Sequence, residues 1–148
     1  MRRAIVIDMD GVLFDTSHIF KKLYELELKG DAKWDYFHQH CNDEEVKLMP
    51  GIRELFTTIY NDVPLAIIVS TARNEKVRKE TMAKLLKHRI IFDHLYMRKD
   101  GDYRPSSEIK KEHLQEIMKD YEVTLFIDYD IENCEMAKEL GILALRRI

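Results

Sequence analysis

The chain has 148 residues, enough for one α/β domain with a substantial core and too few for a comfortable second domain. Its 24 basic and 27 acidic side chains give a formal net charge of −3, so no bulk attraction to nucleic acid or to a membrane surface is expected. Two cysteines without CxxC spacing and the lack of any long apolar segment predict a cytoplasmic protein without membrane contact, with residues 1–148 as a single domain.

Short apolar runs bounded by polar turns recur along the chain and predict buried strands. These runs lie at residues 4–7, 65–69, 94–97, 124–127 and 142–145. Segments with apolar residues at three- and four-residue spacing predict helices at residues 50–60, 74–88, 106–119 and 131–140. Strands that alternate with helices indicate an α/β, Rossmann-like fold, in which a parallel five-stranded sheet is flanked by helices on both faces.

Residues 16–48 have a different pattern. They contain no strand run, but they show helical signals around residues 18–28 and an aromatic patch at Trp34, Tyr36 and Phe37. Because no linker or repeat separates this stretch from the rest, it is interpreted as a small helical cap inserted after the first strand. His38, His40 and Cys41 lie within it, but they lack a partner pair with zinc-ligand spacing and are interpreted as a structural cluster.

Asp8 and Asp10 follow the first predicted strand, one residue apart. Alternate residues of an extended segment project the same way, so both carboxylates can face one small volume, and Gly11 lets the backbone turn sharply beyond them. Such a pocket attracts a divalent cation and then a phosphate. A lone Asp-x-Asp is also compatible with a simple turn or an isolated cation site.

Three further positions fall where predicted strands end or a helix begins. The Thr71 hydroxyl, preferred over Ser70, lies at a strand-to-helix turn that can bind phosphate oxygens, although a helix cap is the alternative. Lys110 begins a predicted helix and can direct its ammonium at a phosphate, with Lys111 as the alternative. Asp128 ends an apolar strand. In parallel sheets, sites form beyond the carboxyl ends of the strands.

Taken in chain order, these sequence segments resemble the motifs of the haloacid dehalogenase (HAD) superfamily. The run from Asp8 to Thr16 is similar to the first motif, and the second, third and last motifs match the words around Thr71, Lys110 and Asp128. The resemblance implies phosphoryl transfer through an aspartyl-phosphate, with Asp8 as nucleophile, Asp10 as general acid–base, and Thr71 and Lys110 on the phosphate. It also implies Mg²⁺ held by Asp8, the backbone carbonyl of Asp10 and Asp128.

The last motif departs from the commonest pattern. Many relatives have two adjacent acids, whereas Asp128 is followed by Tyr129, and the next acid is Asp130. Whether Asp130, Glu132 or Asn133 supports the metal is therefore open.

A narrower resemblance concerns the substrate. Residues 95–104 look like part of the phosphatase domain of phage-type polynucleotide kinases. Those domains remove 3′-phosphates from nucleic acid ends. The cap sequence around Trp34 and Cys41 also resembles stand-alone phosphatases of that group. The implied partners are phosphorylated nucleic acid ends or nucleotides, with no obligate protein partner evident. The predicted substrate-binding residues are Gly11, Arg73, Arg98 and Arg104. The cap aromatics could stack a base or simply pack the cap onto the core.

Other functions remain alternatives at this point. The runner-up is a 5′(3′)-deoxyribonucleotidase or a small-metabolite phosphatase. A receiver-like phospho-switch and an inactive scaffold are the non-enzyme alternatives. A kinase is disfavoured, because the sequence contains no GxxxxGK[ST] phosphate loop.

Overall fold

The sheet at the centre of the protein has five parallel strands in the order β5-β4-β1-β6-β7. A computed structural model describes residues 1–61 and 64–148. The prediction of a parallel five-stranded sheet is confirmed. Its strands are β1 (Arg2–Ile7), β4 (Ala66–Asn74), β5 (His94–Arg98), β6 (Tyr121–Asp128) and β7 (Ala144–Arg146).

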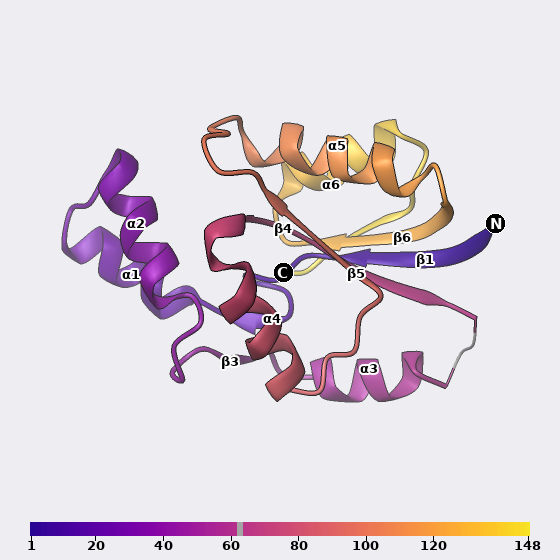
Figure 1. Ribbon diagram of the computed structural model, residues 1–148, viewed down its shortest axis with the longest axis horizontal. Helices are drawn as coiled ribbons and strands as arrows, with labels where there is room; N and C mark the ends of the chain where they lie inside the picture. The colour runs from indigo at the N-terminus through magenta and orange to yellow at the C-terminus, as the bar shows by residue number, and fades with distance from the viewer. Residues whose placement is uncertain (62–63) are drawn as a thin grey trace.

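Helices cover both faces of this sheet (Figure 1). Two of them, α5 (Ser106–Ile117) and α6 (Ile131–Glu139), lie above the sheet in that view, while α3 (Ile52–Ile59) and α4 (Arg78–Lys87) lie below it. Adjacent residues of β1 enter different cores, since Val6 packs with residues of α5 and α6 and Ile7 packs with residues of α3 and α4. Burial on both faces explains why the strand sequences are continuously apolar rather than alternating.

The largest difference from the expected boundaries lies after β4. The strand runs on to Asn74, which pairs with Arg98 beyond a register shift, and a 3₁₀ turn at Glu75–Val77 precedes α4. The helix predicted at residues 74–88 therefore begins four residues late, at Arg78. Pairing with the edge strand β5 outweighs the local helical pattern at this point.

The segment predicted as a cap contains two helices, α1 (Ser17–Glu25) and α2 (Gly30–His40), at the left of Figure 1. Two short strands, β2 (Phe14–Asp15) and β3 (Lys47–Leu48), pair antiparallel at its base. This ribbon was not predicted, because strands of two residues are too short to show a hydrophobic period.

The cap aromatics pack largely against one another. Phe37 is buried, and the centre of its ring lies 5.3 Å from that of Phe20 and 6.1 Å from that of Trp34. His38 Nδ1 lies 2.7 Å from the Trp34 carbonyl oxygen, and Cys41 is free. Among the described residues, no helix combines the length and apolar character needed to cross a membrane.

Candidate active site

Asp8 and Asp128 lie side by side because β1 and β6 are neighbours in the sheet. Ile7 pairs with Ile127, and the Asp8 backbone N–H donates to the Ile127 carbonyl at 3.0 Å. Each carboxylate therefore stands at the carboxyl end of its strand. Asp8 is 4% exposed and Asp128 is fully buried.

Lys110 joins these two carboxylates. Its Nζ lies 2.7 Å from Asp8 Oδ1 and 2.6 Å from Asp128 Oδ2, and its side chain is 2% exposed. Lys111, the next residue of α5, is exposed. Of the two lysines left open by the sequence, Lys110 is the one that lies in the acidic cluster.

The charges in this cluster do not balance. Burial raises the pKa of Asp8 to about 8; Lys110 opposes this rise and Asp128 adds to it. Burial also disfavours the charge on Lys110, but the two carboxylates outweigh that effect and raise its pKa, so the ammonium stays charged. Two carboxylates thus share one buried cation, and at neutral pH the raised pKa leaves Asp8 largely protonated, so a metal cation that binds here takes the place of that proton.

Asn133 is the best placed of the three residues that could support such a cation. Its Nδ2 donates to Asp128 Oδ2 at 3.2 Å, whereas its buried Oδ1 has no hydrogen-bond partner in the described part of the chain. Asp130 caps α6 instead, since its Oδ1 accepts from the Glu132 backbone N–H at 2.8 Å, and Glu132 is exposed. An unpartnered buried oxygen on a side chain that binds Asp128 fits a hard cation, which prefers oxygen ligands.

No group of three or more His, Cys, Asp or Glu side chains within residues 1–61 and 64–148 is placed to hold a metal ion. The predicted ligand set contains two carboxylates, Asp8 and Asp128, and takes its third oxygen from the backbone of Asp10.

Asp10 is held by Arg73, which β4 carries. Arg73 Nε donates to Asp10 Oδ2 at 2.9 Å, and Nη2 donates to Asp10 Oδ1 at 2.7 Å. Two parallel bonds between planar groups fix the orientation of the carboxyl. The Asp10 side chain remains 16% exposed, so a substrate oxygen can still reach it.

The remaining donors of Arg73 bind the segment that follows α2. Nη1 donates to Asn42 Oδ1 at 2.7 Å, and Nη2 donates to the Cys41 carbonyl at 3.1 Å. Arg73 is 2% exposed. The expected contact with substrate phosphate therefore gives way to a different placement, in which Arg73 connects the general acid–base candidate to the cap.

Ser70 and Thr71 have separate partners, as adjacent residues of a strand should. Ser70 Oγ lies 2.8 Å from His113 Nδ1, and His113 Nε2 lies 3.1 Å from the Met97 carbonyl oxygen. Burial lowers the pKa of His113 to about 4, so this ring is neutral and links α5 to the sheet. Thr71 is buried, and its Oγ1 accepts from the Arg73 backbone N–H at 3.2 Å.

Gly11 lies where the chain turns away from the two acids, with a φ of +81°. A Cβ added there would meet three ring carbons of Tyr129 at 2.9, 3.3 and 3.3 Å. The nearest carbon is Cδ1, and its two ring neighbours, Cγ and Cε1, are almost as close. A Cβ that met the edge of the ring would lie farther from these two neighbours, so Gly11 lies against the face of the ring. Both the backbone angle and the ring therefore require glycine.

We expect Gly11→Ala to destabilise the protein by about 1–3 kcal/mol, because a positive φ strains an alanine and the methyl group displaces Tyr129. The measurement is the midpoint of urea unfolding. Gly51→Ala is a matched control, since Gly51 has a φ of +84° and nothing within 4 Å of an added Cβ. Equal losses in the two variants would mean that the ring contact contributes nothing.

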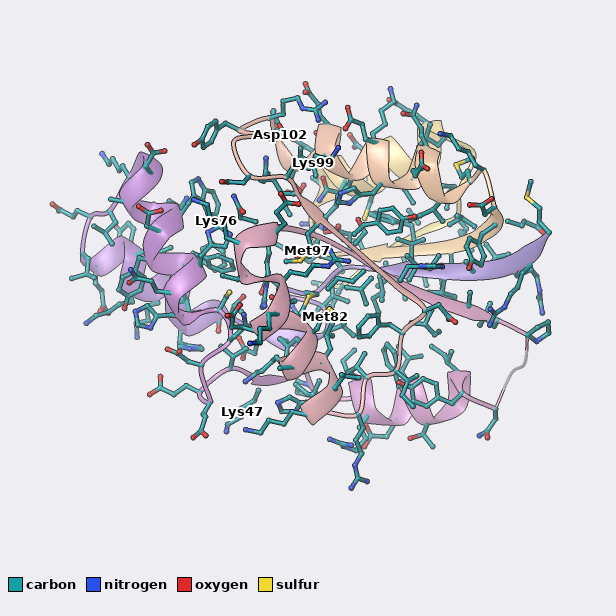
Figure 2. The ribbon with its side chains drawn as sticks, in the orientation of Figure 1. Lys47, Lys76, Met82, Met97, Lys99 and Asp102 are labelled. Atoms are coloured by element: carbon teal, nitrogen blue, oxygen red, sulfur yellow. The ribbon has the colours of Figure 1, made fainter. Side chains whose placement is uncertain are left out.

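Arg98 and Arg104 lie around the loop between β5 and α5, which Lys99 and Asp102 mark in Figure 2. Arg98 donates to the carbonyls of Ala72, Asp102 and Arg104. The Arg104 guanidinium pairs with Asp102 at 2.7 Å and with Glu112. The structure thus gives both predicted phosphate contacts other partners, which hold the loop together.

Sequence reasoning missed Asn42, His113 and the wall formed by Tyr129. Asn42 is a polar residue between elements, and nothing in its sequence context marks it as a partner of Arg73. His113 follows Lys110 by three residues, and this spacing, which places both on one face of α5, was a usable signal.

A family model described as the polynucleotide kinase PNKP phosphatase domain matches residues 2–146 of this chain. No protein among those with curated descriptions matches it.

Solved structures share the fold. The chain aligns with a Pnkp1/Rnl/Hen1 complex structure at 23% identity and a TM-score of 0.77, covering 99% of this chain and 46% of that one. This chain thus spans about half the length of that relative. A hydrolase of the haloacid dehalogenase-like family, SP0104 from Streptococcus pneumoniae, aligns at 17% identity and a TM-score of 0.70, covering 98% and 84% of the two chains. A class C acid phosphatase from Bacillus anthracis aligns at 15% identity and a TM-score of 0.68, covering 89% and 53%.

Proposed function

Because this chain belongs to the family of polynucleotide kinase PNKP phosphatase domains, we propose that it removes 3′-phosphates from nucleic acid ends or nucleotides in a Mg²⁺-dependent reaction. The expected membership of the HAD superfamily is confirmed, and the match to a phosphatase family supports a phosphoric monoester hydrolase over a switch or a scaffold. The observation that carries the proposed mechanism is the buried Asp8–Lys110–Asp128 cluster beside the Asp10–Arg73 pair.

Asp8 is the proposed nucleophile. One of its carboxylate oxygens attacks phosphorus, and the bond from phosphorus to the leaving oxygen breaks with its electron pair on that oxygen. Lys110, at 2.7 Å from Asp8 Oδ1, holds the nucleophile in place and offsets the negative charge of the phosphoryl group. Thr71 is proposed to bind a phosphate oxygen through its hydroxyl.

Asp10 is the proposed general acid and base. It gives its proton to the leaving oxygen and then takes a proton from water, whose oxygen attacks the phosphorus and releases Asp8 and inorganic phosphate. Arg73 holds the plane of this carboxyl through both steps, because it binds both oxygens. In this proposal Arg73 positions the acid rather than binding substrate.

Asp8, Asp128 and the backbone carbonyl of Asp10 are proposed to hold Mg²⁺, with Asn133 Oδ1 beside Asp128 as a further oxygen. The bound ion supplies positive charge that offsets the repulsion between a carboxylate and a phosphate dianion. The two carboxylates that share a single ammonium and the unpartnered Asn133 oxygen support this assignment.

We expect Asp10→Asn to lower kcat/KM, which reports the steps up to release of the leaving group, by about 10²–10⁴-fold, since the amide cannot transfer a proton to the leaving oxygen. The loss should be smaller for an aryl phosphate, whose leaving group needs no proton, than for an alkyl phosphate. Steady-state kinetics with both esters measures this difference. An equal loss for both esters would remove Asp10 from the acid step.

The substrate proposal is tested with one oligonucleotide carrying a phosphate at its 3′ end or its 5′ end. Nucleoside 3′- and 5′-monophosphates and a sugar phosphate complete the set, each with Mg²⁺ and with excess chelator. We expect the highest kcat/KM for the substrates that carry a 3′-phosphate, and no turnover of any substrate in excess chelator. Preference for nucleoside 5′-monophosphates or sugar phosphates would overturn the 3′-end assignment and favour the nucleotidase or metabolite alternative.

A further inference from the structure

A pocket of about 420 Å³ opens beside Asp10, between the strand ends and the cap. Ligand sites of small molecules have volumes of this order. The pocket is lined by Asp10, Gly11, Asp15, Thr16, Ser17, Phe20, Met49, Tyr129 and Arg147. These residues come from the catalytic turn, the start of the cap, the segment after β3, the end of β6 and the segment after β7.

One side of the pocket is aromatic and fixed in place. One face of the Tyr129 ring lies against Gly11, and the residue is still 43% exposed, so other parts of the ring remain accessible. Phe20, from α1, is backed by the buried Phe37 ring, whose centre lies 5.3 Å away. Rings held from behind offer a flat apolar surface at little cost in side-chain entropy.

Arg147 is the one arginine or lysine that lines the pocket, and its charge, after the larger effect of the Ser17 hydrogen bonds, helps to lower the pKa of the Asp15 carboxyl. The Asp10 carboxylate is paired with Arg73, and Asp15 accepts from the Ser17 backbone N–H at 3.0 Å. Arg147 is exposed, and its side chain has no hydrogen-bond or ion-pair partner among the residues that the structure describes. An arginine of this kind can bind a phosphate.

From this pocket, and resting on the proposed function, we infer that the enzyme recognises its leaving group as a nucleotide. The base of the terminal nucleoside stacks on Tyr129, and the phosphate on its 5′ side binds Arg147. The scissile 3′-phosphate then faces Asp8, with its leaving oxygen at Asp10. A base stacked on an aromatic ring is bound without regard to sequence, because every base has a flat face.

Position supports this assignment. Asp10 lines the pocket and is the residue proposed to protonate the leaving oxygen, so the group attached to that oxygen must extend into this space. The lining includes the Tyr129 ring, after β6, and the Arg147 guanidinium, after the neighbouring β7, and these two groups match a base and a second phosphate. A simple alkyl phosphate such as glycerol 2-phosphate has neither group.

The first test compares a nucleoside 3′,5′-bisphosphate with glycerol 2-phosphate, an ester without a ring. We expect Tyr129→Ala to lower kcat/KM for the bisphosphate about tenfold more than it lowers kcat/KM for glycerol 2-phosphate. Tyr129→Phe should retain the wild-type ratio, because the ring is kept. Tyr103→Ala is the matched control, since Tyr103 is 83% exposed and does not line the pocket.

The second test removes the cation. We expect Arg147→Gln to lower kcat/KM about fivefold for the bisphosphate and to leave the nucleoside 3′-monophosphate unchanged, because only the former has a 5′-phosphate. The dissociation constant of the product, a nucleoside 5′-monophosphate, should rise by the same factor in calorimetry. Arg53→Gln, an exposed arginine of α3, should change neither value.

The outcomes separate the subsite from the function. If the wild type hydrolyses glycerol 2-phosphate, the proposed phosphatase mechanism stands, whatever result the Tyr129 and Arg147 variants give. Equal losses for both esters in Tyr129→Ala would mean that the ring only supports Gly11, and unchanged kinetics would remove the base from this pocket. Either result overturns the inference. If the wild type hydrolyses sugar phosphates but no nucleotide, the proposed function fails together with it.

Discussion

Asp8→Asn should abolish turnover, with kcat reduced by at least about 10³-fold, because the amide cannot form the covalent intermediate. The same substitution should not weaken the fold. Burial holds the pKa of Asp8 near 8 in the folded state, well above its ordinary value of 3.8. An acid with a raised folded pKa loses stability as the pH rises from its unfolded pKa to its folded pKa. At pH 7 the folded state keeps Asp8 largely protonated while the unfolded state ionises it, and asparagine, which needs no proton, removes this cost.

Two measurements check this expectation. Thermal unfolding at pH 7 with chelator should give a Tm for Asp8→Asn at least as high as that of the wild type, while phosphate release falls to background. Asp120→Asn, a substitution of an exposed acid outside the site, should leave both values unchanged. Turnover at the wild-type rate in Asp8→Asn would assign the nucleophile elsewhere, and a lower Tm would mean that the ionised carboxylate stabilises the cluster.

Lys110→Met should cost both stability and activity. Removing the ammonium leaves Asp8 and Asp128 buried without their shared cation, and breaking a buried charge pair by removing one partner costs about 3–5 kcal/mol. Loss of the charge next to the nucleophile should lower kcat by about 10²–10³-fold. Urea unfolding and steady-state kinetics measure the two effects.

The neighbouring residue provides the control for this variant. Lys111→Met changes the same side chain one position along α5, where it is exposed, and should alter stability by less than about 0.5 kcal/mol. Added Mg²⁺ should raise the Tm of Lys110→Met, because a cation can replace part of the lost charge. Equal stability of the two variants would mean that Lys110 does not hold the carboxylates together.

The strands and the acids at their ends were the predictable part of this protein. Residues 4–7 of β1 and 125–127 of β6 pack on both faces of the sheet, so these runs are continuously apolar and easy to find. Since parallel strands bring their carboxyl ends together, Asp8 and Asp128 could be placed in one site from the sequence. The choice of Lys110 over Lys111 was also within reach, because Lys110 precedes the buried Leu114 by four residues and Ile117 by seven.

The partners of the arginines were not predictable. Arg73 finds Asp10 across 63 residues and Asn42 across 31, and no local pattern reports such distances along the chain. The expectation of a phosphate contact assumed that an arginine near a site faces the ligand. Here the guanidinium is buried, and a buried charge must be paired, so the fold used Arg73 for a carboxylate of its own.

The bonds that Arg73 makes to Asn42 and to the Cys41 carbonyl have a consequence for the modularity of this enzyme. A hybrid that exchanged residues 16–48 for an insertion from a distant homologue would lose two of the acceptors that immobilise the guanidinium. Arg73 would then position the Asp10 carboxyl less firmly, even though every residue on the sheet was unchanged. Swapping substrate preference by transplanting the insertion would therefore succeed only if the donor segment presents an oxygen at the position of Asn42.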